Sequence, residues 1–370
     1  MPADRTQAIH EFLARAGWGA ATLIPLQGDA STRRYIRLQD KGRKALLMDQ
    51  PQHAEAPAAP ANATPEERRA LGYNAVARLA GADCGRFVAA ANYLRSKALS
   101  APQIYADDAA QGFVLMEDLG DDLFADALTG GADDVTLYGA SAEVLARLHA
   151  QPAPGVLPPD KTFHAYDEIA LLAEVDLLTE WFFPVALGRN ADAEEVEEHR
   201  ALWRKALGPF VDTASVFVHR DYHAQNLLWL SQRNGAARVG LIDFQDAVAG
   251  SKAYDLISLV EDARRDVPAA LAKATTSHYL EAMRKQDQPL DGEAFAQEMA
   301  VFAAQRNAKI VGIFARLFRR DGKPRYLGYL PRVWSYLNRD LEQPALAGLK
   351  SWYDRAIPND ARGMPRCGGA

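Results

Sequence analysis

The chain has 370 residues, too many for one small hydrophobic core and enough for two packed lobes. Its hydrophobic content of 48% and charged content of 24% are typical of a soluble globular protein. The formal net charge of −6 argues against a general nucleic-acid binder, which carries a strong basic excess, but it leaves room for a nucleotide site.

The cysteines and the N-terminus indicate the compartment. Cys84 and Cys367 form neither a disulfide framework nor a metal-ligand spacing, which favours a reducing environment. The first residues lack the basic start and apolar core of a signal peptide. No stretch approaches the roughly 18 apolar residues that a membrane span needs. We therefore expect a cytoplasmic protein with no membrane partner.

The first part of the chain is rich in expected strands. Apolar residues between Ile9 and Ala16 recur at helical spacing, and two glycines then end the helix. Short apolar runs predict strands at 22–26, 34–38, 45–48, 103–105 and 113–116. A second helix is expected at 87–99, with Phe87, Ala90, Ala91 and Leu94 on one face. The first three strands follow one another directly, which predicts a small antiparallel sheet.

The acidic turn at 117–122 ends the strand-rich part, and the remainder is mostly helical apart from three short strands at 216–218, 227–230 and 239–242. This pattern predicts an α+β fold with a small antiparallel-sheet lobe and a larger, mostly helical lobe. The expected boundaries are 1–117 for the N-lobe, 118–357 for the C-lobe and 358–370 for a disordered tail. An Ala/Pro-rich stretch makes 52–80 an expected surface insertion.

The informative region is residues 216–256. An apolar strand is followed by Asp221 and Asn226, five positions apart, and Asp243 comes seventeen positions later, after a predicted hairpin. The hairpin would return Asp243 to the side of Asn226. A carboxylate can accept a proton from a hydroxyl, and amide and carboxylate oxygens suit Mg²⁺, so the set fits phosphoryl transfer. The alternative is a polar hairpin that uses Asp and Asn only as turn formers.

The segments HRDYHAQNLLWL and GLIDFQDAVAGSKAYDL resemble the aminoglycoside phosphotransferase and choline kinase superfamily, relatives of the protein kinases. The matching positions are His219, Asp221, Asn226, Asp243, Phe244, Gly250 and Tyr254-Asp255-Leu256. The resemblance implies a bilobal protein-kinase-like fold that uses ATP and Mg²⁺. It makes Asp221 the catalytic base and Asn226 and Asp243 the metal ligands. It also implies structural roles for His219 and Asp255, and it leaves Asp246 without a role.

Longer blocks, such as GDASTRRYIRL and LLTEWFFP, are similar to the bacterial anomeric kinases for N-acetylmuramate and N-acetylglucosamine. That branch phosphorylates the C1 hydroxyl of the free sugar in peptidoglycan recycling. The similarity covers most of the chain, except for the Ala/Pro insertion and the C-terminal tail. It implies a sugar as the substrate, whereas protein partners are unknown.

Two segments are expected to bind the nucleotide. In the turn between the first two strands, small residues let backbone N–H groups approach phosphate oxygens, and hydroxyls add donors. The residues predicted to contact phosphate are Gly28, Ala30, Ser31, Thr32 and Arg33. Backbone groups near Glu117 and Leu119 are expected to bind the adenine edge. A plain hairpin turn and a solvated acidic linker are the alternatives.

The third expected strand lacks the lysine that kinases pair with the α- and β-phosphates, since Lys44 precedes it and is expected to face outward. The helix at 87–99 also lacks the acid that would pair with such a lysine. The joint absence indicates a lineage without the usual ion pair. We predict that Arg33 or Arg34 supplies the positive charge; the alternative is a pair of solvated surface arginines.

The acceptor site is the least determined part. Candidate sugar ligands are Glu174, Asp176, Glu180, Trp181 and Arg306, because carboxylates accept hydroxyl hydrogen bonds and aromatic rings stack on sugars. Arg306 also opens a basic region that extends to Lys323 and could attract a carboxylate. Ordinary amphipathic helix faces are the alternative for both.

Other functions predict different sequence features. A protein kinase is disfavoured because no Gly follows Asp243-Phe244 and the strand lysine is missing. A kinase for another small alcohol, such as an aminoglycoside or choline, shares the same motif and stays open. A nucleotide-binding pseudokinase would have lost the base or a metal ligand, yet all three are present.

Overall fold

The computed structural model describes residues 3–26, 33–51, 56–211, 213 and 215–364. The chain forms two compact units. Unit 1 consists of Met1–Val144, Pro154–His164 and Ala224–Val248, and unit 2 consists of Leu145–Ala153, Ala165–His223 and Ala249–Ala370. This division differs from the expected boundary near residue 117, because residues 118–144 and 224–248 group with the N-terminal residues in unit 1.

Unit 1 is built on a five-stranded antiparallel sheet with the order β1-β2-β3-β5-β4. The strands are β1 (Thr22–Pro25), β2 (Arg34–Asp40), β3 (Arg43–Asp49), β4 (Ile104–Asp108) and β5 (Phe113–Met116). All five lie where the apolar runs predict them. A two-residue turn joins β2 to β3, and both turn residues, Lys41 and Gly42, have positive φ, as such hairpins require.

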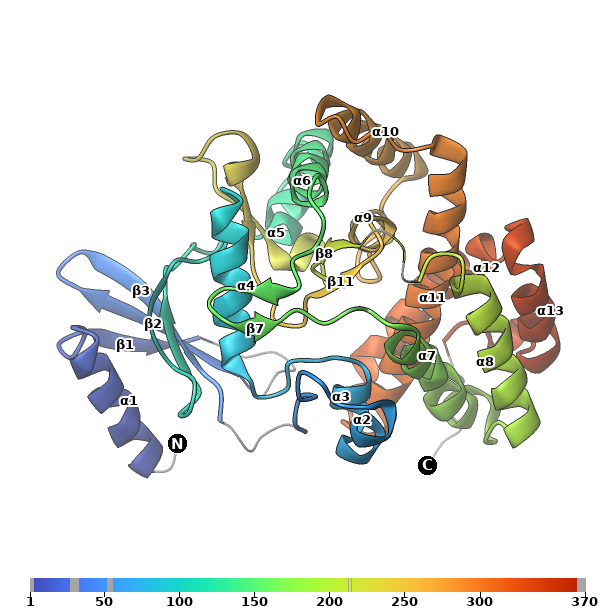
Figure 1. Cartoon of the computed structure of the whole chain (residues 1–370), viewed down its shortest axis with the longest axis horizontal. Coiled ribbons are helices and arrows are strands. Elements are labelled where there is room, and N and C mark those ends of the chain that lie inside the picture. Colours follow the sequence, from blue (N-terminus) through green and yellow to red (C-terminus); the bar gives the residue numbers. More distant parts are fainter. Residues whose placement is uncertain (1–2, 27–32, 52–55, 212, 214, 365–370) are drawn as a thin grey trace. The chain divides into compact units, whose positions relative to one another are not determined.

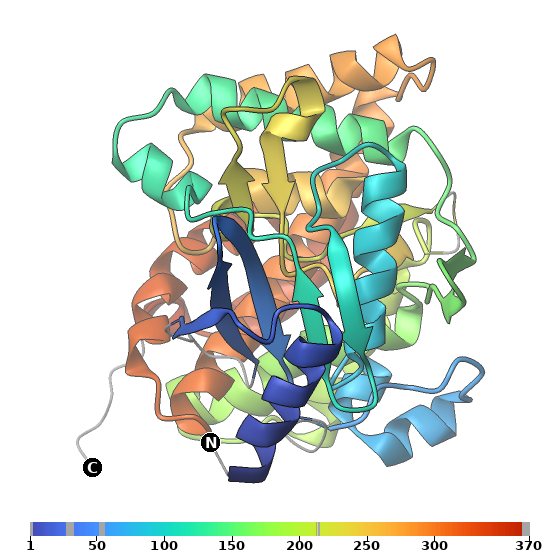
Figure 2. The ribbon, with the colours of Figure 1, turned by 90° about the vertical axis from the view of Figure 1, so that its left-hand side faces the viewer.

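Two helices cover the two faces of this sheet (Figures 1 and 2). The first, α1 (Ala3–Arg15), buries Ile9, Phe12 and Leu13 against one face. That face is made by Ile36, Leu38, Ala45, Leu47, Phe113 and Leu115. The second, α4 (Cys84–Ser96), packs on β4 and β5 and buries the predicted apolar face around Phe87 and Leu94. Alternation of side chains along each strand explains why both faces are apolar.

The rest of unit 1 consists of short helices and hairpins. They are α2 (Pro65–Leu71), α3 (Tyr73–Val76), α5 (Phe124–Thr129), the start of α6 (Asp134–His149), β6 (Val156–Leu157), β7 (Lys161–Thr162), η2 (Ala224–Asn226), β9 (Leu227–Trp229), η3 (Gly235–Arg238) and β10 (Val239–Leu241). The expected insertion at 52–80 is thus partly helical. A Thr64–Glu67 capping box starts α2, and buried Arg68 binds carbonyl groups of α3. Residues 52–55 lie outside the described residues.

Unit 2 is mostly helical, as predicted, and its helices surround α11 (Gly292–Arg319). The other elements are α7 (Glu168–Leu177), η1 (Leu178–Leu187), α8 (Ala193–Leu207), β8 (Val216–Val218), β11 (Val248–Gly250), α9 (Ala253–Val260), α10 (Ala269–Lys285), η4 (Pro324–Tyr329), α12 (Leu330–Asp340), η5 (Pro344–Leu346), α13 (Ala347–Ala356) and η6 (Asn359–Ala361). In the described part of the chain, no helix has the length and apolar character of a membrane span.

One helix of unit 2 is irregular, and part of the expected C-terminal tail is packed. The helix that begins at Glu168 changes at Leu178 into a π-helix, η1, which contains Pro184. The expected disordered tail at 358–370 begins with residues that pack on the unit. Arg362 in this tail forms an ion pair with Asp354 and donates a hydrogen bond to Asn338. Residues 365–370 lie outside the described residues.

The central helix needs a glycine where it meets the end of α7. A Cβ atom at Gly312 would lie 2.5 Å from the carbonyl oxygen of Leu177, which is backbone and has little room to move. We expect Gly312→Ala to lower the free energy of unfolding by about 1–3 kcal/mol or more, since overpacking forces such shifts. Urea unfolding followed by circular dichroism measures this change.

Gly292, in the first turn of the same helix, is the matched control. A Cβ atom at this position would have no other atom within 4 Å, so Gly292→Ala should be neutral or stabilising by up to about 1 kcal/mol. Equal effects of the two substitutions would contradict the close contact at Gly312.

Candidate functional site

The predicted site residues are divided between the two units. Unit 1 contains Arg33, Glu117, Leu119, Asn226 and Asp243, and unit 2 contains Glu174, Asp176, Glu180, Trp181, His219, Asp221, Asp255 and Arg306. Gly28, Ala30, Ser31 and Thr32 lie outside the described residues.

In unit 1, a short hairpin brings Asn226 and Asp243 together. Strands β9 and β10 pair antiparallel, and Ile242 donates its backbone N–H to the carbonyl oxygen of Asn226 at 3.2 Å. The next residue, Asp243, therefore lies beside Asn226, with 3.5 Å between Asn226 Nδ2 and Asp243 Oδ2. This is the placement that the predicted hairpin required.

The donor set at this hairpin fits Mg²⁺. An amide and a carboxylate lie side by side, and 43% of the Asp243 side chain is exposed, so a ligand can reach it. Mg²⁺ takes one or two such protein oxygens and completes its shell with phosphate oxygens and water. Among the described residues, no group of three or more His, Cys, Asp or Glu side chains gathers as a metal site of its own.

Two side chains orient the Asp243 carboxylate. Arg33 Nη1 and Gln245 Nε2 each donate to its Oδ1 atom at 3.0 Å. Burial lowers the pKa of Arg33, but the Asp243 carboxylate raises it, and the net shift is upward, so Arg33 is a permanent cation at this place. Asp243 itself has a φ of 64°, an uncommon conformation for a residue with a side chain. Gln245 was not predicted as a site residue.

The residues after Asp243 tie the hairpin to α4 and to the segment before it. Phe244 is fully buried and stacks on Phe87 of α4, with 4.8 Å between ring centroids. Asp246, which had no expected role, accepts a hydrogen bond from the backbone N–H of Ala80 at 2.6 Å. These contacts fix the direction in which the chain leaves Asp243.

The two candidate arginines have different partners. Arg34 lies 2.7 Å from the fully buried carboxylate of Asp49, which also pairs with Arg5 from α1. Arg33, by contrast, reaches Asp243. Lys44 is exposed, as expected, and α4 contains no acidic residue. The geometry of unit 1 therefore associates Arg33, rather than Arg34, with the predicted metal ligands.

The segment around Glu117 is joined to the same hairpin. Glu117 forms ion pairs with Arg233, from the turn between β9 and β10, and with Arg95 of α4. Trp229 of β9 donates its N–H to the carbonyl oxygen of Asp122 at 2.8 Å. Unit 1 thus holds the expected adenine-binding segment and the expected metal ligands in one packed structure.

In unit 2, Asp255 shapes the loop that carries Asp221. Its fully buried carboxylate accepts the backbone N–H groups of His219 at 2.6 Å and Arg220 at 2.9 Å. Burial raises the pKa of Asp255 to about 7, against the effect of the two N–H donors. Arg220 has a φ of 75°, which costs free energy and needs such support. Asp255 thus holds the backbone of this loop at two consecutive residues.

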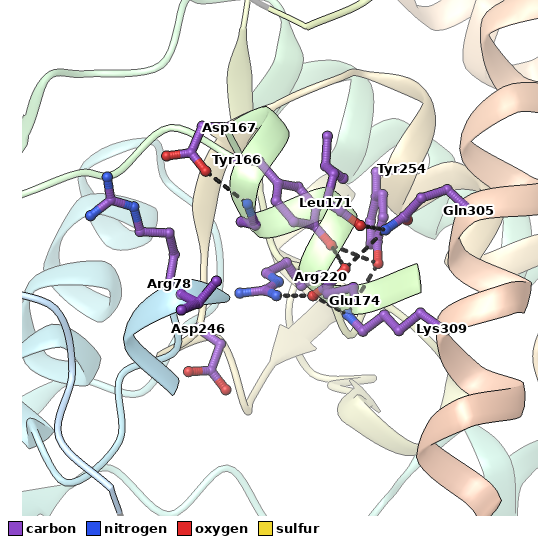
Figure 3. A network of polar contacts seen from close by, with 12 residues as sticks. Arg78, Tyr166, Asp167, Leu171, Glu174, Arg220, Asp246, Tyr254, Gln305 and Lys309 are labelled. Carbon is purple, nitrogen blue, oxygen red and sulfur yellow. Dashed lines mark hydrogen bonds and ion pairs between the residues drawn. The ribbon is translucent and has the colours of Figure 1, made fainter. Parts of the chain in front are cut away.

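Arg220 is anchored through its side chain as well. Its buried guanidinium pairs with Glu174 of α7 and lies over the ring of Tyr166 (Figure 3). Glu174 also pairs with Lys309 of α11. Glu174 was predicted as an acceptor ligand, but it lies inside unit 2 with its carboxylate occupied by these partners. The sequence around Glu174 gave no sign of this burial.

The other acceptor candidates do not gather at one place in unit 2. Asp176 pairs with Arg200 of α8, and Arg306 is buried, where it binds Ser258 and the carbonyl oxygen of Glu261. Glu180 is exposed and Trp181 half-buried. Both lie in η1, where the change of helical repeat breaks the face that Asp176 and Glu180 would share in an α-helix.

The role of Asp255 can be tested by an isosteric change. Asp255→Asn leaves one carbonyl oxygen for two N–H donors, so one buried donor loses its partner. We expect the free energy of unfolding to fall by about 1–3 kcal/mol, as measured by urea unfolding. Asp266→Asn is the control, because the Asp266 side chain is 85% exposed and its ion pair with Arg332 should contribute less than about 1 kcal/mol. Similar losses in the two variants would contradict the role of Asp255.

Comparison with protein families identifies a match over most of the chain. Residues 22–290 match the model of the phosphotransferase enzyme family. An N-acetylmuramate/N-acetylglucosamine kinase from Caulobacter vibrioides is 43% identical over 98% of this chain and 99% of its own length. A kinase of the same name from Pseudomonas aeruginosa is 34% identical over 92% of this chain and 90% of its own length.

Solved structures share the fold at much lower identity. A choline/ethanolamine kinase family protein from Mesorhizobium loti has a TM-score of 0.57 at 15% identity, covering 95% of this chain and 99% of that protein. An ADP-bound aminoglycoside phosphotransferase has a TM-score of 0.53 at 13% identity, with the same coverage. These structures confirm the predicted α+β kinase-like fold.

Proposed function

Because this chain belongs to the phosphotransferase enzyme family, we propose that it is an ATP-dependent sugar kinase that phosphorylates N-acetylmuramate and N-acetylglucosamine. The observation that carries the proposal is the 43% identity, over nearly both full lengths, to a kinase named for these two sugars. The reacting group in this proposal is the anomeric C1 hydroxyl. The reaction belongs to peptidoglycan recycling in the cytoplasm.

Asp221 acts as the catalytic base in this proposal. It orients the C1 hydroxyl and accepts its proton as the bond to the γ-phosphorus forms. Asn226 and Asp243 hold the Mg²⁺, which supplies charge neutralisation for the phosphates when bound. The support for these roles is the side-by-side placement of Asn226 and Asp243 and the shaping of the Asp221 loop by Asp255.

Arg33 takes the place of the missing strand lysine. Its guanidinium, held at Asp243 Oδ1, is a permanent positive charge next to the expected metal ligands. Gly28, Ala30, Ser31 and Thr32 contribute phosphate contacts in the same proposal. The backbone at Glu117 and Leu119 binds the adenine edge, as in kinases of this fold. Glu180 and Trp181 stay candidates for the sugar, because both have solvent-accessible side chains.

The proposed activity is tested with a panel of acceptors in the presence of ATP and Mg²⁺. We expect ADP release with N-acetylmuramate and N-acetylglucosamine and, by NMR of the product, a phosphate on C1. The control is Asp221→Asn, which should lower kcat by about 100-fold or more while ATP still binds. Turnover with only choline or aminoglycosides would contradict the sugar assignment. An active Asp221→Asn enzyme would contradict the assignment of the base.

The role of Arg33 is tested against its neighbour. We expect Arg33→Ala to lower kcat/KM for ATP by about 100-fold, the usual effect of removing one donor to developing charge. Arg34→Ala should reduce stability through Asp49 and leave kcat/KM for ATP within about threefold. Steady-state kinetics at saturating sugar measure both values. An Arg33→Ala enzyme with wild-type kinetics would exclude this cation.

A further inference from the structure

Unit 2 contains a buried ion network around Arg220, the residue before Asp221 (Figure 3). Its charged members are Glu174 on α7, Arg220 on the loop and Lys309 on α11. Their side chains are 0%, 1% and 13% exposed, so water screens their charges weakly. In the proposed function, none of these three residues has a part in catalysis.

All the donors of the network converge on Glu174. Its Oε1 atom pairs with Arg220 and, at 2.8 Å, with Lys309 Nζ. Its Oε2 atom accepts from the Tyr166 hydroxyl and, at 3.1 Å, from Gln305 Nε2. Burial alone would raise the pKa of Glu174, but Lys309 and Arg220 lower it to about 2. Glu174 is therefore an anion, and each of its two carboxylate oxygens has two partners.

The charges of the network do not cancel. Arg220 and Lys309 are two cations that share one carboxylate, which leaves one buried positive charge in excess. A buried charge is costly unless another group balances it. Glu174 raises the pKa of Lys309 most, and Asp221, the residue after Arg220, adds to the rise.

The network also constrains the backbone next to Asp221. Arg220 has a left-handed φ of 75°, a strained conformation that persists only when its surroundings enforce it. Asp255 holds the backbone N–H of Arg220, while Glu174 and the Tyr166 ring hold its guanidinium. Arg220, the residue before Asp221, is therefore held through both its backbone and its side chain.

We propose that Glu174 and Lys309 are positioning residues of the phosphotransfer reaction: Glu174 holds Arg220 and so orients Asp221, and Lys309 holds the Glu174 carboxylate in place. The inference rests on the proposed role of Asp221 as the base. A purely structural ion network, by contrast, would affect folding but not the kinetics of the folded enzyme.

Glu174→Gln tests the orienting part, since it keeps the shape of the side chain and removes its charge. We expect kcat to fall by about 30-fold or more, with KM for ATP within about threefold, because the proposed nucleotide residues belong to unit 1. Glu168→Gln, on the same helix, is the control. Glu168 pairs with Arg204 at the surface, and its loss should change kcat by less than twofold. Kinetics are normalised to the folded fraction measured by circular dichroism.

Lys309→Met tests whether Glu174 needs its second cation to hold Arg220 in place. Removal of the Lys309 cation leaves the Glu174 carboxylate with one ion pair fewer, so we expect kcat to fall by about tenfold, with KM for ATP within about threefold. Lys309→Arg, which keeps the charge, should keep kcat within about threefold of the wild-type value.

The outcomes separate the inference from the proposed function. If Asp221→Asn is inactive but Glu174→Gln and Lys309→Met behave as wild type, the inference is wrong and the proposed base stands. If Glu174→Gln does not fold, a wild-type kcat in folded Lys309→Met is sufficient to overturn it. If Asp221→Asn stays active, the proposed role of Asp221 as the base is wrong, and the inference that rests on it is wrong as well.

Discussion

The carboxylate of Asp255 accepts hydrogen bonds from two consecutive backbone amides, and the geometry of the loop before Asp221 depends on them. Hydrogen bonds of this kind are stronger when the carboxylate is buried away from water. Asp255 is fully buried in the first turn of α9. The strained backbone of Arg220 follows directly from it. The ion pair with Glu174 then holds the side chain of the same residue, so that one loop is held by two separate helices of unit 2, α9 and α7.

Unit 1 holds Asn226 and Asp243 in place with a different set of contacts. The hairpin of β9 and β10 offers only three residues per strand, too few to be stable alone. It is held by Phe244 against α4, by Arg233 against Glu117 and by hydrogen bonds to residues 100 and 122. A small sheet with many lateral attachments can keep the two proposed metal ligands in register without a large core of its own.

Much of the fold and part of the site could be predicted from local patterns. Alternating apolar runs located all five strands of the sheet, and the spacing of Asp221, Asn226 and Asp243 indicated the hairpin, because both signals are short-range. The burial of Glu174 could not be predicted, since its partners lie 46 and 135 positions away along the chain. Gln305 and Lys309, four residues apart on α11, share a helix face, which was the available hint. Gln245 was not predicted, because a single polar residue in a loop belongs to no helical or strand periodicity.

The discontinuous make-up of unit 1 bears on how the chain folds during synthesis. The five-stranded sheet is complete once residue 116 has been made, but residues 224–248, which belong to the same unit, are made more than a hundred residues later. Until they emerge from the ribosome, the apolar surface of α4 around Phe87 lacks Phe244. A nascent chain of intermediate length therefore exposes an apolar surface that is buried in the finished protein. This is the stage of synthesis at which a chaperone would be most useful.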